Sequence, residues 1–329
     1  MPSWGEILRE IANKEAEWVE LVKQGKRNIP NPCDAVRRKY LAKLYEYTGR
    51  NTIIYASSWT QPHQIPPEFV SITEEDIQGF MEAIYGLKGD SLDLILHSPG
   101  GLPGATEALV SYLRKKFNDI RVIIPQAAMS AATMLACAAN KIVMGKHSSL
   151  GPVDPQLILQ TPLGRRSVPA GAILDQFNLA KSECETNPKR LGTWVPILQQ
   201  YGPALLVESI NAVELSKELV YKWLKEYMFK GEEDAEERAR RISETLSDYQ
   251  YFKSHSRHIS IDEAKKIGLA VEELEDDQEF QDLVLSVFHA TTITFDKTSA
   301  VKIIENHEGR AFIKLLPVSK PETQKSKKE

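Results

Sequence analysis

The feature that most constrains the fold is a strand–turn–helix unit that repeats through the centre of the sequence. Residues 92–97 (LDLILH) form a continuous apolar run, which is typical of a strand buried on both faces of a parallel sheet. The turn SPGG and a helix over 103–117 follow. The same order then repeats, with the strand IRVIIP, the turn QAAM, a helix over 130–139 and the strand KIVMG. Short loops between alternating strands and helices predict a right-handed βαβ array over residues 50–155.

Helices are predicted on both sides of this array. An amphipathic pattern over 3–24 and a second helix over 34–47 precede it, followed by the β-rich run NTIIYAS. Capping boxes at 73–76 and 260–263 each open a helix, and further helical patterns cover 168–185, 203–229 and 232–247. The sequence predicts four parts: an N-terminal helical extension, 1–49; an α/β core that would carry the catalytic residues, 50–200; a helical C-terminal part packed on it, 201–319; and a solvated, disordered Lys-rich tail, 320–329.

Composition excludes several classes of protein. The net charge of -4 gives no indication of a nucleic-acid partner, and no apolar run is long enough to cross a bilayer. The N-terminal residues are too charged for a signal peptide, so a cytoplasmic location is expected. Cys33, Cys137 and Cys184 form no CxxC pair and the histidines have no ligand spacing, so neither a metal site nor another cofactor is expected.

Two strand-to-helix turns carry the residues that predict chemistry. In the first, Pro99-Gly100-Gly101 lets the backbone take unusual dihedrals and lets another group approach closely. In the second, Ser130 lies where a strand ends and a helix begins, between alanines that leave its hydroxyl accessible. The N–H groups of Gly101 and Ala131 would hold an oxyanion formed there. A serine at such a place is most often only a helix N-cap, and a Pro-Gly-Gly most often only a turn. Their occurrence on successive parallel strands favours a site, because ligands bind at the ends of neighbouring strands.

The segments LILHSPGG, MSAA, NKIVMG and SSLGPVDPQ together resemble the ClpP/SppA superfamily, and in particular the serine dehydrogenase proteinases, which are relatives of signal peptide peptidase. The resemblance covers residues 35–290. It implies a ClpP/crotonase-like core of stacked βαβ units, peptide or protein substrates, an acyl-enzyme mechanism and ring-like homo-oligomers. It carries the nucleophile onto Ser130 and the oxyanion-hole amides onto Gly101 and Ala131. No P-loop motif is present, so any ATP-driven unfolding would come from another chain.

The general base is less clearly indicated by the sequence. The segment 148–156, where ClpP-like chains carry a histidine, has none, and His147 comes too early and reads as a surface turn residue. Signal-peptide-peptidase-like enzymes use a lysine about fifty residues after the serine. Lys181 follows Ser130 by 51 residues (181 minus 130) and lies at the edge of an apolar helix face. Lys181 is therefore the predicted base, with a solvated helix lysine as the alternative. Asp154 is expected to cap a segment or to polarise a site group. The remaining histidines, His255 among them, are interpreted as structural or surface residues.

Two other functions stay open at this point. A crotonase-like acyl-CoA enzyme would share the fold and the paired amides, although the segment 127–156 holds no glutamate of the kind such an enzyme places at its site. A catalytically silent oligomeric scaffold would explain the unclear base.

Overall fold

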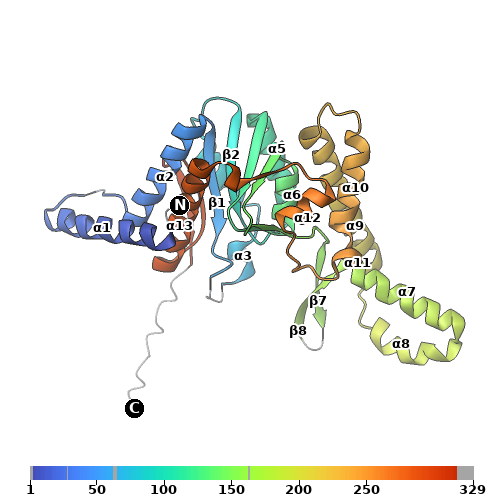
Figure 1. Ribbon diagram of the computed structural model, residues 1–329. Coiled ribbons are helices and arrows are strands. Elements are labelled where there is room, and N and C mark those ends of the chain that lie inside the picture. Colours follow the sequence, from blue (N-terminus) through green and yellow to red (C-terminus); the bar gives the residue numbers. More distant parts are fainter. Residues whose placement is uncertain (1–2, 28, 62–64, 162–163, 317–329) are drawn as a thin grey trace, which may run out of the picture.

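The structure is a computed structural model that describes residues 3–27, 29–61, 65–161 and 164–316. The predicted tail over 320–329 lies outside these residues. The centre of the molecule is a seven-stranded sheet with the strand order β11-β10-β1-β2-β3-β5-β9 (Figure 1). Its parallel strands are β1 (Asn51–Ser57), β2 (Ser91–His97), β3 (Asp119–Ile124), β5 (Lys141–Met144) and β9 (Val271–Glu273). The short strands β4 (Ala127–Ala128) and β6 (Ser149–Leu150) pair in parallel with each other.

The larger hydrophobic core lies on one face of the sheet. Apolar side chains that alternate along the strands, such as Ile53, Leu94 and Val122, point into it because successive residues of a strand face opposite sides. The helices that supply the other half of this core are α4 (Asp76–Ile84), α5 (Pro103–Lys116), α6 (Ala131–Cys137), α9 (Leu205–Trp223), α10 (Ala235–Ser247) and α12 (Ile261–Ile267). A π-helical turn, Leu224–Met228, continues α9, and the short helices α3 (Pro67–Val70) and α11 (Tyr249–Phe252) lie in the connections.

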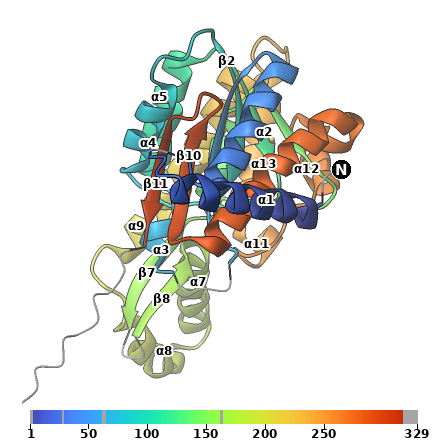
Figure 2. The same cartoon turned by 90° about the vertical axis from the view of Figure 1, so that its left-hand side faces the viewer.

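The opposite face of the sheet is covered by helices from the two ends of the described chain. Helices α2 (Pro32–Thr48) and α13 (Gln278–Lys297) pack on the alternate strand residues, among them Ile54, Ile95 and Ile123. Helix α1 (Trp4–Lys23) packs on α2 and α13 through Ile7 and Ile11, so that it forms an outer layer (Figure 2).

A helical arm projects from this layered body. It begins with the antiparallel hairpin of β7 (Gln156–Thr161) and β8 (Gly164–Pro169) and continues into α7 (Ala170–Thr186) and α8 (Leu191–Leu198). Both ribbon views show α7 and α8 extending away from the sheet. Only Ala170, Ile173 and Ala180 of α7 are buried, and the described α8 buries none of its residues. The arm is therefore held to the body through few apolar contacts.

The predicted strands and helices of the centre are confirmed, but the C-terminal part is not simply helical. The structure has β10 (Ala300–Asn306) and β11 (Ala311–Leu315) here; β10 pairs antiparallel with β1, and β11 pairs antiparallel with β10. The run AVKIIEN does not look like a buried strand because it contains charged residues. Those charges are buried in ion pairs: Lys302 pairs with Asp76, and Glu305 pairs with arginines of α2. The helical C-terminal part predicted over 201–319 thus contains strands as well as helices.

Candidate active site

The two turns singled out in the sequence lie side by side at the carboxyl ends of β2 and β3. The Ser98 N–H donates to the carbonyl of Ala127 over 3.2 Å, and the Met129 N–H donates to the carbonyl of Ser98 over 3.0 Å. These bonds continue the parallel pairing of β2 and β3 beyond the main sheet, with Ser98 opposite Ala128. The Pro-Gly-Gly turn and Ser130 are therefore held together by backbone hydrogen bonds, as expected from their places on neighbouring strands.

Ser130 has the backbone geometry of a strained site residue. Its φ of 52° and ψ of −120° are rarely adopted by a residue with a side chain, and such outliers cost on the order of 1–3 kcal/mol. Although Ser130 occupies the N-cap position of α6, its side chain makes no capping hydrogen bond. The N-cap interpretation therefore does not account for this serine. Its half-buried side chain stays available to a ligand.

The glycines of the first turn are required by close backbone contact. A Cβ atom on Gly100, which has φ of 94°, would lie 2.5 Å from the Met129 carbonyl oxygen and 2.8 Å from the Ala131 nitrogen. At Gly101 a Cβ atom would lie 2.3 Å from the carbonyl oxygen of Ile72. Only a residue without a side chain lets this turn pack directly against the backbone on which Ser130 lies.

Two amide groups at this junction have no acceptor. The N–H groups of Ile72 and Leu102 donate within the bridge between Ile72 and the turn, whereas those of Gly101 and Ala131 donate to no group among the described residues. Backbone N–H groups are almost always paired when they are not exposed. Two free donors beside a serine are the arrangement that an oxyanion requires.

Small side chains surround the serine, as the sequence analysis expected. Ala128, Ala131 and Ala132 are buried and belong to the larger core, so no bulky group covers the hydroxyl from α6. Cys137, seven positions further along the chain, is fully buried, and burial raises the pKa of its thiol to about 12. A thiol that stays protonated is a poor nucleophile, so Cys137 does not compete with Ser130.

The structure places Lys181 on the projecting arm. Its side chain is 64% exposed, and its ammonium group lies 4.0 Å from a carboxylate oxygen of Glu185. The apolar pocket that a lysine base needs is not formed around it by the described residues of one chain. His147 lies in the turn after β5, where its Nε2 contacts the Pro125 carbonyl oxygen at 2.9 Å.

A carboxylate–histidine pair that the sequence did not predict joins the segment after β6 to the segment before α12. Asp154 is 2% exposed, and its Oδ1 lies 2.9 Å from Nδ1 of His255. The two residues are 101 positions apart, so no local motif reports the contact. The only sequence signals were an aspartate between two prolines in GPVDPQ and a histidine shortly before the helix over 261–267.

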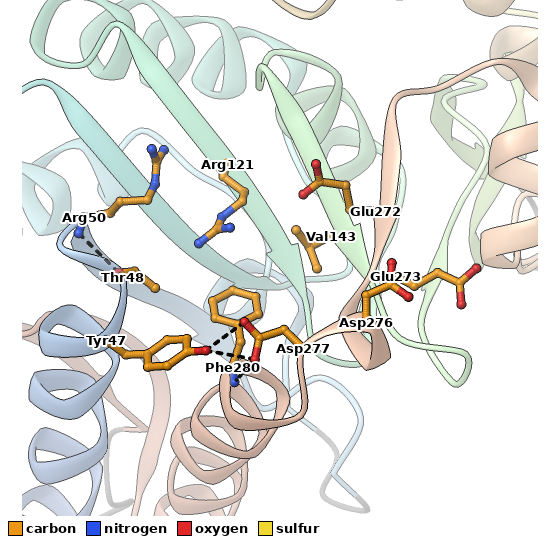
Figure 3. Close-up of a pocket in the computed structure, with 10 residues that line it drawn as sticks. All are labelled: Tyr47, Thr48, Arg50, Arg121, Val143, Glu272, Glu273, Asp276, Asp277 and Phe280. Atoms are coloured by element: carbon orange, nitrogen blue, oxygen red, sulfur yellow. Dashed lines mark hydrogen bonds between the residues drawn. The ribbon is translucent and has the colours of Figure 1, made fainter.

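A hollow of about 480 Å³ lies elsewhere, toward the amino-terminal ends of the strands (Figure 3). Arg50, which precedes β1, and Arg121 of β3 line it, together with acidic side chains of β9 and of the segment after it, such as Glu272 and Asp277. Both arginines already bind the fully buried Asp93, at 2.7 Å and 2.6 Å. This charge cluster holds the sheet together and lies away from the carboxyl ends of the strands, where Ser130 lies.

The fold and the paired turns define the class of the protein: a mixed α/β protein with the ClpP-like arrangement. A comparison with family models agrees. The model for the ClpP-like SDH-type serine proteinases matches residues 64–289, more than half of the sequence, and the chain belongs to this family.

Relatives of the chain are found in an archaeon. Uncharacterized protein MJ0137 of Methanocaldococcus jannaschii is 31% identical over 207 residues, which cover 63% of this chain and 62% of that protein. Uncharacterized protein MJ1495 of the same organism is 28% identical over 208 residues, with 62% and 60% covered. The matches thus span about three-fifths of the length of these relatives.

Among solved structures, a mutant of the 1510-N membrane-bound stomatin-specific protease is similar, with a TM-score of 0.38 and 14% identity. The match covers 65% of this chain and 79% of that one. In the present chain, no helix among the described residues is both long and apolar enough to span a membrane.

Proposed function

We propose that this chain is a serine peptidase that hydrolyses peptide bonds through an acyl-enzyme on Ser130. The observation that carries the proposal is the conformation of Ser130, which is held at a positive φ with an uncapped side chain beside two free amides. Membership in a serine proteinase family supports it. The enzyme is proposed to act as an endopeptidase that needs no ATP of its own, in the cytoplasm.

The chemistry follows from the geometry of the two turns. Ser130 Oγ attacks the carbonyl carbon of the peptide, and the oxygen that becomes negative accepts hydrogen bonds from the N–H groups of Gly101 and Ala131. The C–N bond then breaks, and the amine leaves with the proton that Ser130 gave up. Water hydrolyses the remaining ester in a second step of the same kind.

The predicted lysine base receives no support from the described residues. A lysine accepts a proton only when it is neutral, and Lys181 instead has a solvated side chain next to Glu185. Lys181 stays a prediction that requires a neighbouring subunit to bury it.

The test of the nucleophile is the pair Ser130→Ala and Ser111→Ala, where Ser111 is an exposed serine on α5. Casein hydrolysis and labelling by a fluorophosphonate probe are measured on the full chain. We expect Ser130→Ala to lose both and Ser111→Ala to keep both, with the probe mass on Ser130. Unchanged hydrolysis by Ser130→Ala would contradict the proposal, and a wild-type chain that neither cleaves nor labels would support the scaffold alternative.

A further inference from the structure

Asp154 and His255 are arranged like a carboxylate and the general-base histidine that it orients. A carboxylate accepts hydrogen bonds only, so Nδ1 of His255 donates to Asp154 Oδ1 and Nε2 is left as the acceptor. Nε2 has no partner among the described residues. The other oxygen of Asp154 accepts from Gln156 Nε2 at 2.9 Å, which fixes the carboxylate on both sides.

Strand pairing connects the segment that leads into Asp154 with the segment that leads into Ser130. Strand β6 pairs in parallel with β4, with Leu150 opposite Ala128, which lies two residues before Ser130. The next contact agrees, since a Cβ atom on Gly151 would lie 3.2 Å from Cα of Met129. Asp154 follows two residues further along the same segment.

A third segment, which carries His255, pairs with β6 on the side away from β4. Leu150 and Ile259 form an antiparallel bridge with hydrogen bonds of 3.0 Å and 2.8 Å. Counted four residues on from this bridge, an antiparallel register would place His255 opposite Asp154, and their side chains are joined by the 2.9 Å contact. Strand β6, which leads into Asp154, therefore lies between β4, which leads into Ser130, and the segment that carries His255.

We propose that His255, oriented by Asp154, is the general base for Ser130. This inference rests on the proposed function. Nε2 of His255, directly or through one water molecule, takes the Ser130 hydroxyl proton as Oγ bonds to the carbonyl carbon. The resulting imidazolium, stabilised by Asp154, gives that proton to the leaving amine when the C–N bond breaks. The same exchange with water releases the acyl group, so that the protons balance over the cycle.

Two other histidines nearby lack this arrangement. His147 Nε2 is bound to the carbonyl of Pro125, and His258 Nδ1 contacts the hydroxyl of Ser149 at 2.8 Å. Neither bond comes from a buried carboxylate that would stabilise an imidazolium. His258 lies three residues from His255 on the same segment and serves as its matched control.

The experiment compares His255→Gln, His255→Ala and His258→Gln as full chains, with Ser130→Ala as the reference. We expect His255→Gln to lower kcat for a fluorogenic peptide by on the order of 100-fold or more, with KM and Tm close to wild type. His258→Gln is expected to stay within about twofold. Added imidazole should restore part of the activity of His255→Ala, which loss of a merely structural histidine would not allow.

Asp154 is a positioning residue and is tested by Asp154→Asn. The amide can present its NH₂ group to Nδ1, which leaves the proton on Nε2 and removes the acceptor. We expect kcat to fall at least as far as in His255→Gln, with KM unchanged.

The possible failures are distinguishable. Wild-type kcat in His255→Gln overturns this inference, and loss of activity in Lys181→Met at the same time assigns the base to Lys181. Equal losses in His255→Gln and His258→Gln also overturn it, because they would mean that both histidines act by maintaining the structure of the segment that carries them. Activity in Ser130→Ala instead defeats the proposed function itself.

Discussion

At the scale of single residues, the backbone conformation of Ser130 is fixed by the structure around it. Ser130 holds its positive φ because α6 and the Pro-Gly-Gly turn are fixed around it by hydrogen bonds of Ser98 and Met129. Strain of this kind persists only when the surrounding structure over-determines it. His97, the last residue of β2, is a second polar residue of this region that the surrounding structure holds in an unfavourable state, because it is buried.

His97 makes the stability of the protein dependent on pH. It is 1% exposed, lies between Trp59 and Phe288, and has no partner at Nδ1, and burial lowers its pKa to about 3. The unfolded chain binds this proton near pH 6.5 and the folded chain does not, so stability is lost as the pH falls from 6.5 toward 3.

We expect the free energy of unfolding of the wild type to fall by about 2 kcal/mol more than that of His97→Phe between pH 7 and pH 5. Urea titrations at the two pH values measure the difference. The other histidines are present in both proteins and cancel. An identical pH dependence in the two proteins would show that His97 is not buried as a neutral ring.

At the scale of elements, a buried ion pair connects three parts of the fold. Asp76 at the start of α4 accepts from the Lys302 ammonium of β10 at 2.7 Å and 2.9 Å, and from the Tyr55 hydroxyl of β1 at 2.7 Å. Burial lowers the pKa of Lys302, and Asp76 acts in the opposite direction. The pair thus fixes the antiparallel edge strand and α4 against the parallel sheet.

Asp76→Ala is expected to lower the free energy of unfolding by about 3–5 kcal/mol, because it leaves the buried Lys302 without its counterion. The neighbouring Glu75 pairs with Lys314 at the surface, and Glu75→Ala should cost no more than about 1 kcal/mol. Chemical denaturation of the two variants provides the comparison. A loss as small for Asp76 as for Glu75 would mean that the buried pair contributes little.

For the whole molecule, the projecting arm is the feature that a single chain does not explain. Its α8 is largely apolar but buries no described residue, and Leu179, Leu191 and Val195 are more than a third exposed. Exposed apolar surface of this kind marks an interaction site. A homo-oligomer, as the resemblance to ring-forming enzymes implies, would cover it.

We expect sedimentation to show an assembly well above the chain mass of 37.1 kDa. Leu191→Asp combined with Val195→Asp should reduce its size, because two charges would enter the covered face. Val22→Asp, at an equally exposed apolar position on α1, is the control and should leave the assembly intact. A wild-type monomer at micromolar concentration, or an unaffected double variant, would contradict this prediction.

The sequence by itself determined the parallel core and the position of the two turns. Buried strands such as LDLILH and IRVIIP are continuous apolar runs, and Pro-Gly-Gly and Ser130 follow them directly, so local patterns report them. The strands 300–306 and 311–315 escaped prediction because their charges are neutralised by partners more than two hundred residues away. Periodicity cannot reveal such compensation.

Only the tertiary structure decided where the candidate base residues lie. Spacing along the chain selected Lys181, but helix α7 carries that side chain out onto an exposed arm. Asp154 and His255 are separated by 101 residues and meet because β6 pairs with β4 on one side and with the segment before α12 on the other. Contacts made through strand pairing depend on which strands become neighbours. That choice is made by packing of the whole chain and leaves no local mark in the sequence.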